Sequence, residues 1–319
     1  MIGTTASPAY RLVGIGLVVL SAASFGTLAL FARRAYSAGA DPLTVIFVRF
    51  AIASVLIGAI VRLRQDRFPT GRVLLTLVLM GGAGYVCQSL AYLTALTLAP
   101  ASLVALLLYL FPGLVTVLSV VFLHEHLTRV KVGALVVALL GTALTIGPKG
   151  GGHPLGIALA VSAAGIYAVY ILVGSRVTGR AGALASSTVI MSAAAAVSGV
   201  MIVVHGPAFP HTASGWAALV AIALVSTALP IVALFEGLSR VGPTTGATLS
   251  TVEPVVTVLL AALFLQEPLG PWQMAGGLFI LAAVVALARS APTRPGKPSD
   301  PGLALIVASP HATDVYEAR

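Results

Sequence analysis

Long apolar runs separated by short polar connections fill this sequence from residue 12 to residue 289. A helix needs about 20 mostly apolar residues to cross the hydrocarbon core of a bilayer. By this measure the pattern predicts ten membrane-spanning segments, at residues 12–32, 42–62, 73–96, 101–123, 130–147, 154–175, 184–205, 213–236, 244–265 and 271–289. The connections between them are too short to hold a soluble domain.

The apolar runs are continuous and rich in Ala, Leu and Val, whereas the strands of a membrane β-barrel alternate apolar and polar residues. Helices also satisfy their own backbone hydrogen bonds in lipid. Only 8% of the residues are charged, against about 25% in an ordinary soluble domain. The predicted fold class is therefore an all-α membrane protein with ten transmembrane helices.

The net charge of +9 comes from short clusters of Lys and Arg between the apolar runs, which does not resemble a nucleic-acid-binding face. If both termini are cytoplasmic, only Arg33, Arg34 and Lys149 fall in outer loops, and Arg49 lies within a helix. The positive-inside rule then predicts a multi-pass protein of the plasma or inner membrane with both ends in the cytoplasm. Residues 1–11 form a short cytoplasmic N-terminus in this scheme, and the proline-containing residues 290–319 form a disordered cytoplasmic tail.

An internal repeat divides the predicted spans into two groups of five. Ala91–Leu127 aligns without a gap to Ala233–Leu269 at an offset of 142 residues. The rarer residues that recur are the pairs Pro112 and Pro254, Phe122 and Phe264, and Glu125 and Glu267. We expect a first five-helix repeat at 12–147, a linker at 148–153 and a second repeat at 154–289. Because five is odd, the second copy enters the membrane inverted, an architecture typical of secondary transporters.

The motifs of the two halves are characteristic in combination. The first half carries Ala91-Tyr92-Leu93-Thr94-Ala95-Leu96, Pro112, Phe122-Leu123-His124-Glu125 and Gly133, and the second carries Leu249 to Pro254, Phe264-Leu265-Gln266-Glu267 and Gly276-Gly277. The chain resembles the EamA-type branch of the drug/metabolite transporter superfamily. It departs from that pattern at His124 and Gln266, where members commonly carry glycine. The resemblance implies ten helices in inverted repeats, a central cavity, and most often export of amino acids or other small metabolites.

Ionisable residues inside a membrane cost roughly 2.5–3.5 kcal/mol on insertion scales and are functional candidates. Glu253, beside Pro254 in the ninth predicted span, could bind a coupling proton or cation, or a substrate amine. It could also be a structural carboxylate, protonated or paired with arginine. We interpret Arg49 as structural. Glu236 lies four residues before Arg240, a spacing that favours a helical ion pair over a substrate contact.

Polar side chains mark one face of the third predicted span. Tyr85, Gln88 and Tyr92 follow the spacing i, i+3 and i+7, which places them together and predicts a face turned toward a cavity. The other candidates for substrate binding are Tyr109, Tyr167, Tyr170 and Thr251. Ser21, Ser24 and Thr248 are better explained by hydrogen bonds between helices. Gly81, Gly82 and Gly84 are expected to allow close backbone approach.

No catalytic, metal or cofactor site is predicted. The glycines at 147–152 lack the spacing of a phosphate-binding loop, and His124 and His126 point to different faces of a helix. The chain is therefore expected to be a secondary transporter rather than an enzyme. The alternatives are an uptake or exchange carrier of the same fold, or a non-transporting membrane subunit. The resemblance favours export of small amphipathic metabolites such as amino acids, by alternating access, and coupling to a proton or cation is one way to drive it. A single intramembrane arginine disfavours strongly anionic substrates, and nothing in the sequence specifies an oligomeric state.

Overall fold

The computed structural model describes residues 8–123, 128–146, 152–177, 182–241, 246 and 249–290. Helices account for nearly all of the regular structure in this part of the chain. In chain order they are α1 (Pro8–Gly26), α2 (Leu28–Ser37), α3 (Pro42–Leu63), α4 (Gly71–Leu79), the π-helix η1 (Met80–Tyr85), α5 (Val86–Leu98), α6 (Ala101–Leu108), α7 (Phe111–Leu123), α8 (Arg129–Ile146), α9 (Pro154–Val177), α10 (Ala183–His205), α11 (Ala213–Ala223), the π-helix η3 (Leu224–Ala228), α12 (Leu229–Val241), α14 (Val252–Phe264) and α15 (Pro271–Ser290).

Seven helical segments of the described chain are long and apolar enough to cross a membrane. They are Ala9–Ser37, Pro42–Leu63, Gly71–Leu98, Ala101–Phe122, Pro154–Gly174, Ala183–His205 and Ala213–Val241. Two shorter apolar helices follow, Val252–Phe264 and Pro271–Ala286. The three predicted spans outside the seven correspond to α8, α14 and α15; α8 and α15 each end beside residues outside the described part of the chain. The structure is thus a multi-helix membrane bundle.

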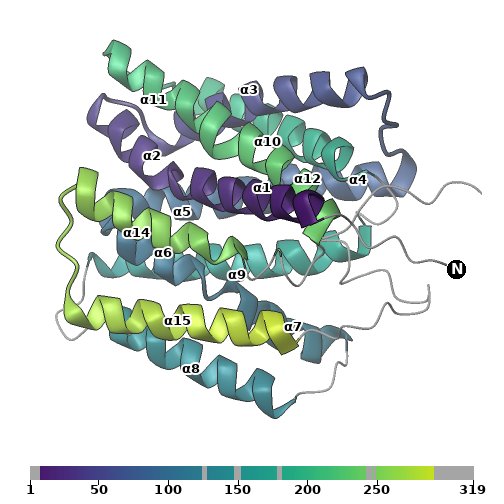
Figure 1. Cartoon of the computed structure of the whole chain (residues 1–319). Helices are drawn as coiled ribbons and strands as arrows, with labels where there is room; N and C mark the ends of the chain where they lie inside the picture. Colours follow the sequence, from purple (N-terminus) through teal and green to yellow (C-terminus); the bar gives the residue numbers. More distant parts are fainter. Residues whose placement is uncertain are drawn as a thin grey trace, which may run out of the picture.

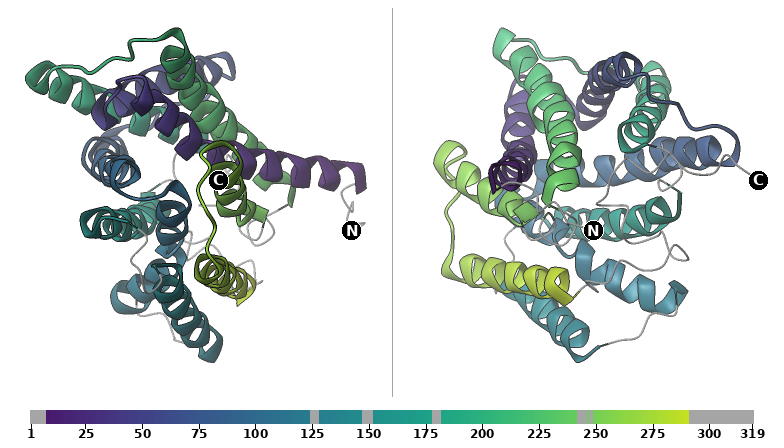
Figure 2. Two further views of the ribbon diagram at one scale, coloured as in Figure 1. Left: turned by 90° about the vertical axis from the view of Figure 1, so that its left-hand side faces the viewer. Right: turned by 45° about the vertical axis from the view of Figure 1, so that its right-hand side comes forward.

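The helices lie side by side in one bundle (Figure 1). The most extensive helix–helix contacts are made by α8 with α15, α3 with α10, α1 with α12, and α5 with α9. The left view of Figure 2 shows several helices nearly end-on, with α15 beside α8 at one edge of the bundle. Large apolar side chains such as Leu63, Val203 and Leu278 are exposed on the outside, as expected for a surface that faces hydrocarbon.

Several predicted spans are interrupted rather than regular. The first passes from α1 to α2 at Thr27, and the fourth breaks between α6 and α7. π-helical turns η1 and η3 interrupt the third and the eighth. Such turns occur frequently at functional sites because they change the direction of side chains within a helix. Both turns border the central polar residues described below.

The first predicted span ends too early. The apolar run stops near residue 32, but α2 continues to Ser37, so Arg33 and Arg34 lie on a helix and not in a loop. The helix continues because Arg33 has polar partners beside it: Arg33 Nη2 donates to the carbonyl oxygen of Ala99 at 2.6 Å. A tertiary contact of this kind leaves no trace in a hydropathy pattern.

Close backbone approach is visible at Gly81, where an added Cβ atom would clash with the carbonyl oxygen of Ile190 on α10. This confirms the role predicted for that glycine. A similar approach joins α8 to α15: a Cβ on Gly141 would lie 2.8 Å from the carbonyl oxygen of Gly276. Small residues let membrane helices pack with backbones in contact.

We expect Gly141→Ala to lower the thermal unfolding temperature of the purified protein, because overpacking a close helix contact typically costs about 1–3 kcal/mol. Gly133→Ala is the matched control, since it lies on the same helix and an added Cβ there meets no atom within 4 Å. Differential scanning fluorimetry in detergent would measure both. Equal melting temperatures for the two variants would contradict this account of the α8–α15 contact.

Candidate functional site

Six aromatic side chains form a continuous series of ring contacts through the bundle, which we call the aromatic chain. Its successive centroid distances are 4.8 Å from Phe50 to Tyr85, 5.5 Å from Tyr85 to Tyr170, 6.0 Å from Tyr170 to Tyr167, 4.8 Å from Tyr167 to Phe111 and 5.8 Å from Phe111 to Tyr109. These separations are those of interacting aromatic pairs. The rings come from α3, η1, α9, α7 and the end of α6, so helices far apart in sequence build one apolar surface.

Arg49 of α3 lies at one end of the aromatic chain. Its Nε donates to Thr227 Oγ1 at 2.8 Å, and its Nη2 lies 3.4 Å from the hydroxyl of Tyr85. The guanidinium also stands 5.0 Å from the ring centre of Phe50 and 5.9 Å from that of Tyr85. Arg49 is 4% exposed, and within the described part of the chain no carboxylate pairs with it. A buried positive charge therefore stands against the first two rings.

Glu253 lies at the other end. The hydroxyl of Tyr109 lies 2.9 Å from Glu253 Oε2 and 3.2 Å from the carbonyl oxygen of Ser250. Glu253 is half-buried, and in the described residues its side chain bonds to this tyrosine rather than to an arginine. The aromatic chain thus runs from a guanidinium on the membrane-length helix α3 to a carboxylate on the shorter apolar helix α14.

Pro254 explains the local geometry around Glu253. A proline at this position cannot donate to the carbonyl of Ser250, four residues earlier, and the hydroxyl of Tyr109 approaches that free carbonyl. Glu253 stands near the middle of the predicted ninth span but just after a break: Leu249 and Ser250 are helical, Thr251 forms a turn, and Glu253 occupies the first turn of α14. Proline is well tolerated in a first turn, where the missing N–H has no helical partner, so the helix begins here instead of bending.

The predicted polar face of the third span turns inward. Gln88 and Tyr92 of α5 are each 7% exposed, and Tyr85 is half-buried in η1. Tyr92 packs in the main apolar core, and Ser89 Oγ donates to Gln88 Oε1 at 3.3 Å. Of the three, only Tyr85 belongs to the aromatic chain. The roles of Gln88 and Tyr92 in binding stay predictions.

Among the remaining hydroxyl candidates, Ser21 links two helices. Ser21 Oγ on α1 donates to the carbonyl oxygen of Pro230 on α12 at 2.7 Å, which confirms the interhelical hydrogen bond expected there. Thr251 immediately precedes α14 and is half-buried beside Glu253. Thr248 and the His124-Glu125-His126 triplet lie outside the described residues.

The comparisons with known proteins agree with this architecture. A family model described as the EamA-like transporter family matches residues 12–147 and residues 154–289. This chain belongs to the EamA-like transporter family. The family resemblance read from the sequence is therefore confirmed, and so is the prediction of a transporter rather than an enzyme. A multi-pass membrane protein with a small-molecule substrate follows.

Relatives of this EamA-like protein extend over most of its length. The uncharacterized transporter YcbK of Bacillus subtilis is 24% identical over 283 residues, which cover 84% of this chain and 91% of that protein. The aromatic amino acid exporter YddG of Ancylobacter novellus is 28% identical over 205 residues, covering 61% of this chain and 70% of that protein. A protein crystal structure at 24% identity shares the fold with a TM-score of 0.61, covering 89% of this chain and 99% of that chain.

A second polar cluster in this EamA-like transporter surrounds Glu267, in the connection between α14 and α15. Its Oε1 accepts from the amide of Ala101 at 2.7 Å, and its Oε2 accepts from the amide and the hydroxyl of Ser102 at 3.1 Å and 2.8 Å. Arg33 Nη2 lies 3.8 Å from Oε1. Gln273 Nε2 donates to Ser102 Oγ at 2.7 Å. A carboxylate from the end of α14 therefore caps the N-terminus of α6, where free amides and the helix dipole favour negative charge.

The Glu267 cluster holds together one end of the bundle. A recess of about 460 Å³ lies there, lined by Arg33, Thr97, Leu98, Ala99, Pro100, Leu265 and Glu267. In Figure 1 this end, with the connection from α14 to α15, lies opposite the described N-terminus. Sequence reasoning singled out Glu267 only as a repeated residue; its recurrence at the position matching Glu125 was the available signal.

The opposite end of the bundle carries a different ion pair. Arg240 Nη1 lies 3.0 Å from Glu236 Oε2, which confirms the pair expected from their spacing on α12. Arg64, just after α3, adds a second contact at 2.7 Å to Glu236 Oε1. These groups are partly exposed, so the pairs contribute little stability. Glu236 thus joins α3 to α12 away from the aromatic chain.

Sequence reasoning found four of the six aromatic-chain residues and missed Phe50 and Phe111. Both are ordinary apolar residues in a membrane sequence, and only their ring contacts distinguish them. Arg49, interpreted as structural, is held by Thr227 as that interpretation expects, yet it also borders the aromatic chain. A stacking partner cannot be inferred from a hydropathy pattern.

Proposed function

We propose that this EamA-like protein is a secondary transporter that exports a small amphipathic zwitterion, such as an amino acid with an aromatic side chain, by alternating access. The observation that carries the proposal is the aromatic chain, with a guanidinium at one end and a carboxylate at the other. Arg49 is the buried cation available to the α-carboxylate of the solute, and Glu253 is the carboxyl group available to its α-amine. The rings supply apolar and cation–π contacts to the rest of the solute.

The proposed architecture is ten spans in two inverted five-helix repeats, with both termini in the cytoplasm. The packing pattern supports it, because exchanging the first five predicted spans with the last five leaves the main helix pairs unchanged: α1 with α12 becomes α9 with α5. The π-helices η1 and η3 also interrupt corresponding spans. Pro112 and Pro254, which match in the repeat, both lie in the first turn of a helix that follows a break, Pro112 as the second residue of α7 and Pro254 as the third residue of α14.

In this scheme the Glu267 cluster closes the outer end of the pathway. Glu267, Arg33 and Ser102 come from both proposed repeats, so their contacts must separate when the repeats rock apart. Charge-assisted hydrogen bonds are stronger than neutral ones. The cluster therefore stabilises the outer-closed conformation until binding of the solute and the coupling ion favours the outer-open conformation.

Proton coupling is assigned to Glu253. The hydroxyl of Tyr109 has one proton, and it faces two acceptors, Glu253 Oε2 and the carbonyl oxygen of Ser250. A protonated Glu253 resolves this competition, because it donates to the oxygen of Tyr109 while Tyr109 donates to Ser250. Binding of a solute amine then displaces the proton, which exchanges one positive charge for another at the same carboxyl group.

The direct test is counterflow of radiolabelled L-phenylalanine in proteoliposomes that contain the purified protein. We expect unlabelled L-phenylalanine to compete best, with phenethylamine and 3-phenylpropionate weaker because each lacks one of the two charged groups. L-Glutamate is expected to compete poorly, since it adds a negative charge and has no ring. If L-alanine competes as well as L-phenylalanine, the aromatic chain is not the binding surface.

A further inference from the structure

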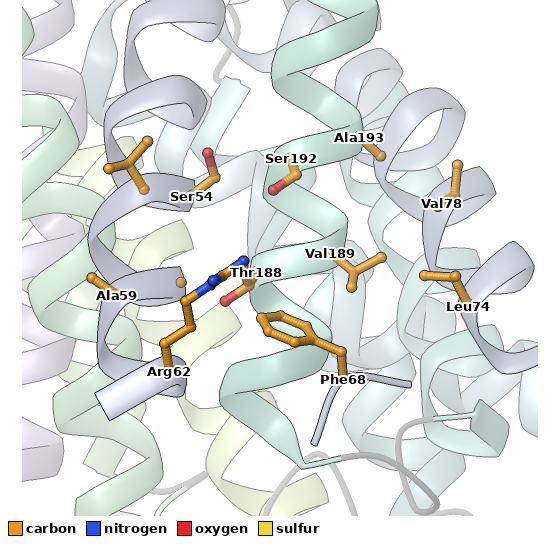
Figure 3. A pocket seen from close by; sticks show the side chains of 12 residues that line it. Ser54, Ala59, Arg62, Phe68, Leu74, Val78, Thr188, Val189, Ser192 and Ala193 are labelled. Carbon is orange, nitrogen blue, oxygen red and sulfur yellow. The ribbon is translucent and has the colours of Figure 1, made fainter. Parts of the chain in front are cut away.

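A groove on the outside of the bundle lies apart from the aromatic chain. It has a volume of about 710 Å³ and is bounded by α3, α10, α4 and the connection between α3 and α4. Figure 3 shows Ser54 and Ala59 on one wall, Thr188, Ser192 and Ala193 on a second, and Leu74 and Val78 on a third. Its volume is that of a typical ligand site, about 300–1,000 Å³.

The walls of the groove are apolar and open to the hydrocarbon. Val55, Phe68, Leu74 and Val78 are among the exposed large hydrophobic side chains of the chain. Small residues at the base of the groove make it deep. Gly58 faces Thr188, whose Cγ2 would lie 3.2 Å from a Cβ added to that glycine. The groove therefore suits a flexible hydrocarbon chain, which can follow an irregular apolar surface.

The charge of the groove is confined to one end. Arg62, in the last turn of α3, lines the groove there (Figure 3). Among the described residues no carboxylate pairs with Arg62, whereas Arg64 is engaged by Glu236. Outside the groove lining, Arg67 in the following connection and Arg72 at the start of α4 add positive charge, against the single carboxylate of Asp66. A ligand that fits an apolar groove with an unpaired cation at one end is an amphipathic anion.

We propose that this groove binds one anionic phospholipid, with an acyl chain between α3, α4 and α10 and the phosphate at Arg62. Ser54, Thr188 and Ser192 offer hydroxyl groups along the groove. Basic pockets between membrane helices on the cytoplasmic side are suited to anionic headgroups. The α10 wall of the groove also packs against η1, which carries Tyr85, so a bound lipid buttresses the segment that holds the aromatic chain.

The test measures retention of dioleoylphosphatidylglycerol and dioleoylphosphatidylcholine by the full-length protein, using native mass spectrometry after delipidation and titration. We expect the wild type to retain phosphatidylglycerol preferentially. Arg62→Gln is expected to weaken that retention about fivefold, the loss expected for one basic residue near an anionic surface. Arg67→Gln removes one positive charge from the connection that follows α3, but Arg67 does not line the groove, so retention by this variant is expected to match the wild type. Ala193→Leu narrows the groove and is expected to reduce retention of both lipids.

Three results would overturn the proposal. Equal losses in the Arg62 and Arg67 variants would mean diffuse attraction to the basic connection. Equal retention of the two lipids by the wild type would remove the anion site. A change in oligomeric state caused by Ala193→Leu, without a change in lipid retention, would make the groove a contact between two copies of the chain.

Discussion

Replacing Glu253 by glutamine is expected to weaken binding of L-phenylalanine by roughly 30-fold or more, while binding of 3-phenylpropionate changes little. Truncating one partner of a desolvated charge pair typically costs about 2–5 kcal/mol, and only the solute with an amine has that pair to lose. The measurement is the concentration of each unlabelled compound that halves counterflow. In the same vesicles, an imposed pH gradient should no longer drive accumulation, because glutamine cannot carry the coupling proton.

Tyr109→Phe is the matched control for Glu253→Gln. It keeps the ring of the aromatic chain and the charge of Glu253, and it removes only the hydroxyl that lies 2.9 Å from the carboxylate. We expect a loss of about fivefold, since a single hydrogen bond contributes roughly 1 kcal/mol. A Glu253→Gln variant that binds L-phenylalanine as the wild type does, and still responds to the pH gradient, would remove Glu253 from the mechanism.

Glu267→Ala is expected to have the second large effect, on the outer end of the bundle. The amides of Ala101 and Ser102 would lose their acceptors, at about 1–3 kcal/mol for each donor left without a partner. Arg33 would lose its carboxylate neighbour as well. Hydrogen–deuterium exchange should therefore become faster at the start of α6, and the melting temperature should fall by several degrees.

Glu236→Gln serves as the control for Glu267→Ala. It also removes a carboxylate that pairs with arginine, but at the opposite end of the bundle, so exchange at the start of α6 should stay as in the wild type. A structural cap alone would lower stability without changing transport kinetics. If the Glu267 cluster also closes the outer end of the pathway, Glu267→Ala should in addition change the ratio of outward to inward flux. An unchanged ratio would leave Glu267 only its role as the cap of α6.

Hydropathy alone located the membrane-length helical segments, though not the breaks and π-helices inside them, because a bilayer requires long apolar helices that satisfy their own backbone groups. The pattern located the seven spans that are long and apolar enough to cross a membrane to within a few residues at most ends. It failed where a tertiary contact overrode composition, as at α2, which continues past its apolar run because Arg33 bonds to Ala99.

Side-chain chemistry was predicted less completely. Rare groups in an apolar background, such as Glu253 and the tyrosines, can be recognised without a structure because burying them is costly. The side chains that contact these groups cannot be recognised from the sequence. Tyr109 and Glu253 are 144 positions apart, and no local spacing rule connects residues at such a distance.

By itself, then, the sequence determined that this chain is a helical membrane protein of a transporter family, since composition, repeated motifs and helix length express local physics. Only the tertiary structure decided that six rings form a continuous surface between Arg49 and Glu253, that Glu267 caps α6, and that a groove ends at Arg62. Each of these depends on which helix faces which. That choice is made by the packing of small residues and polar pairs from distant segments, which a one-dimensional pattern does not record.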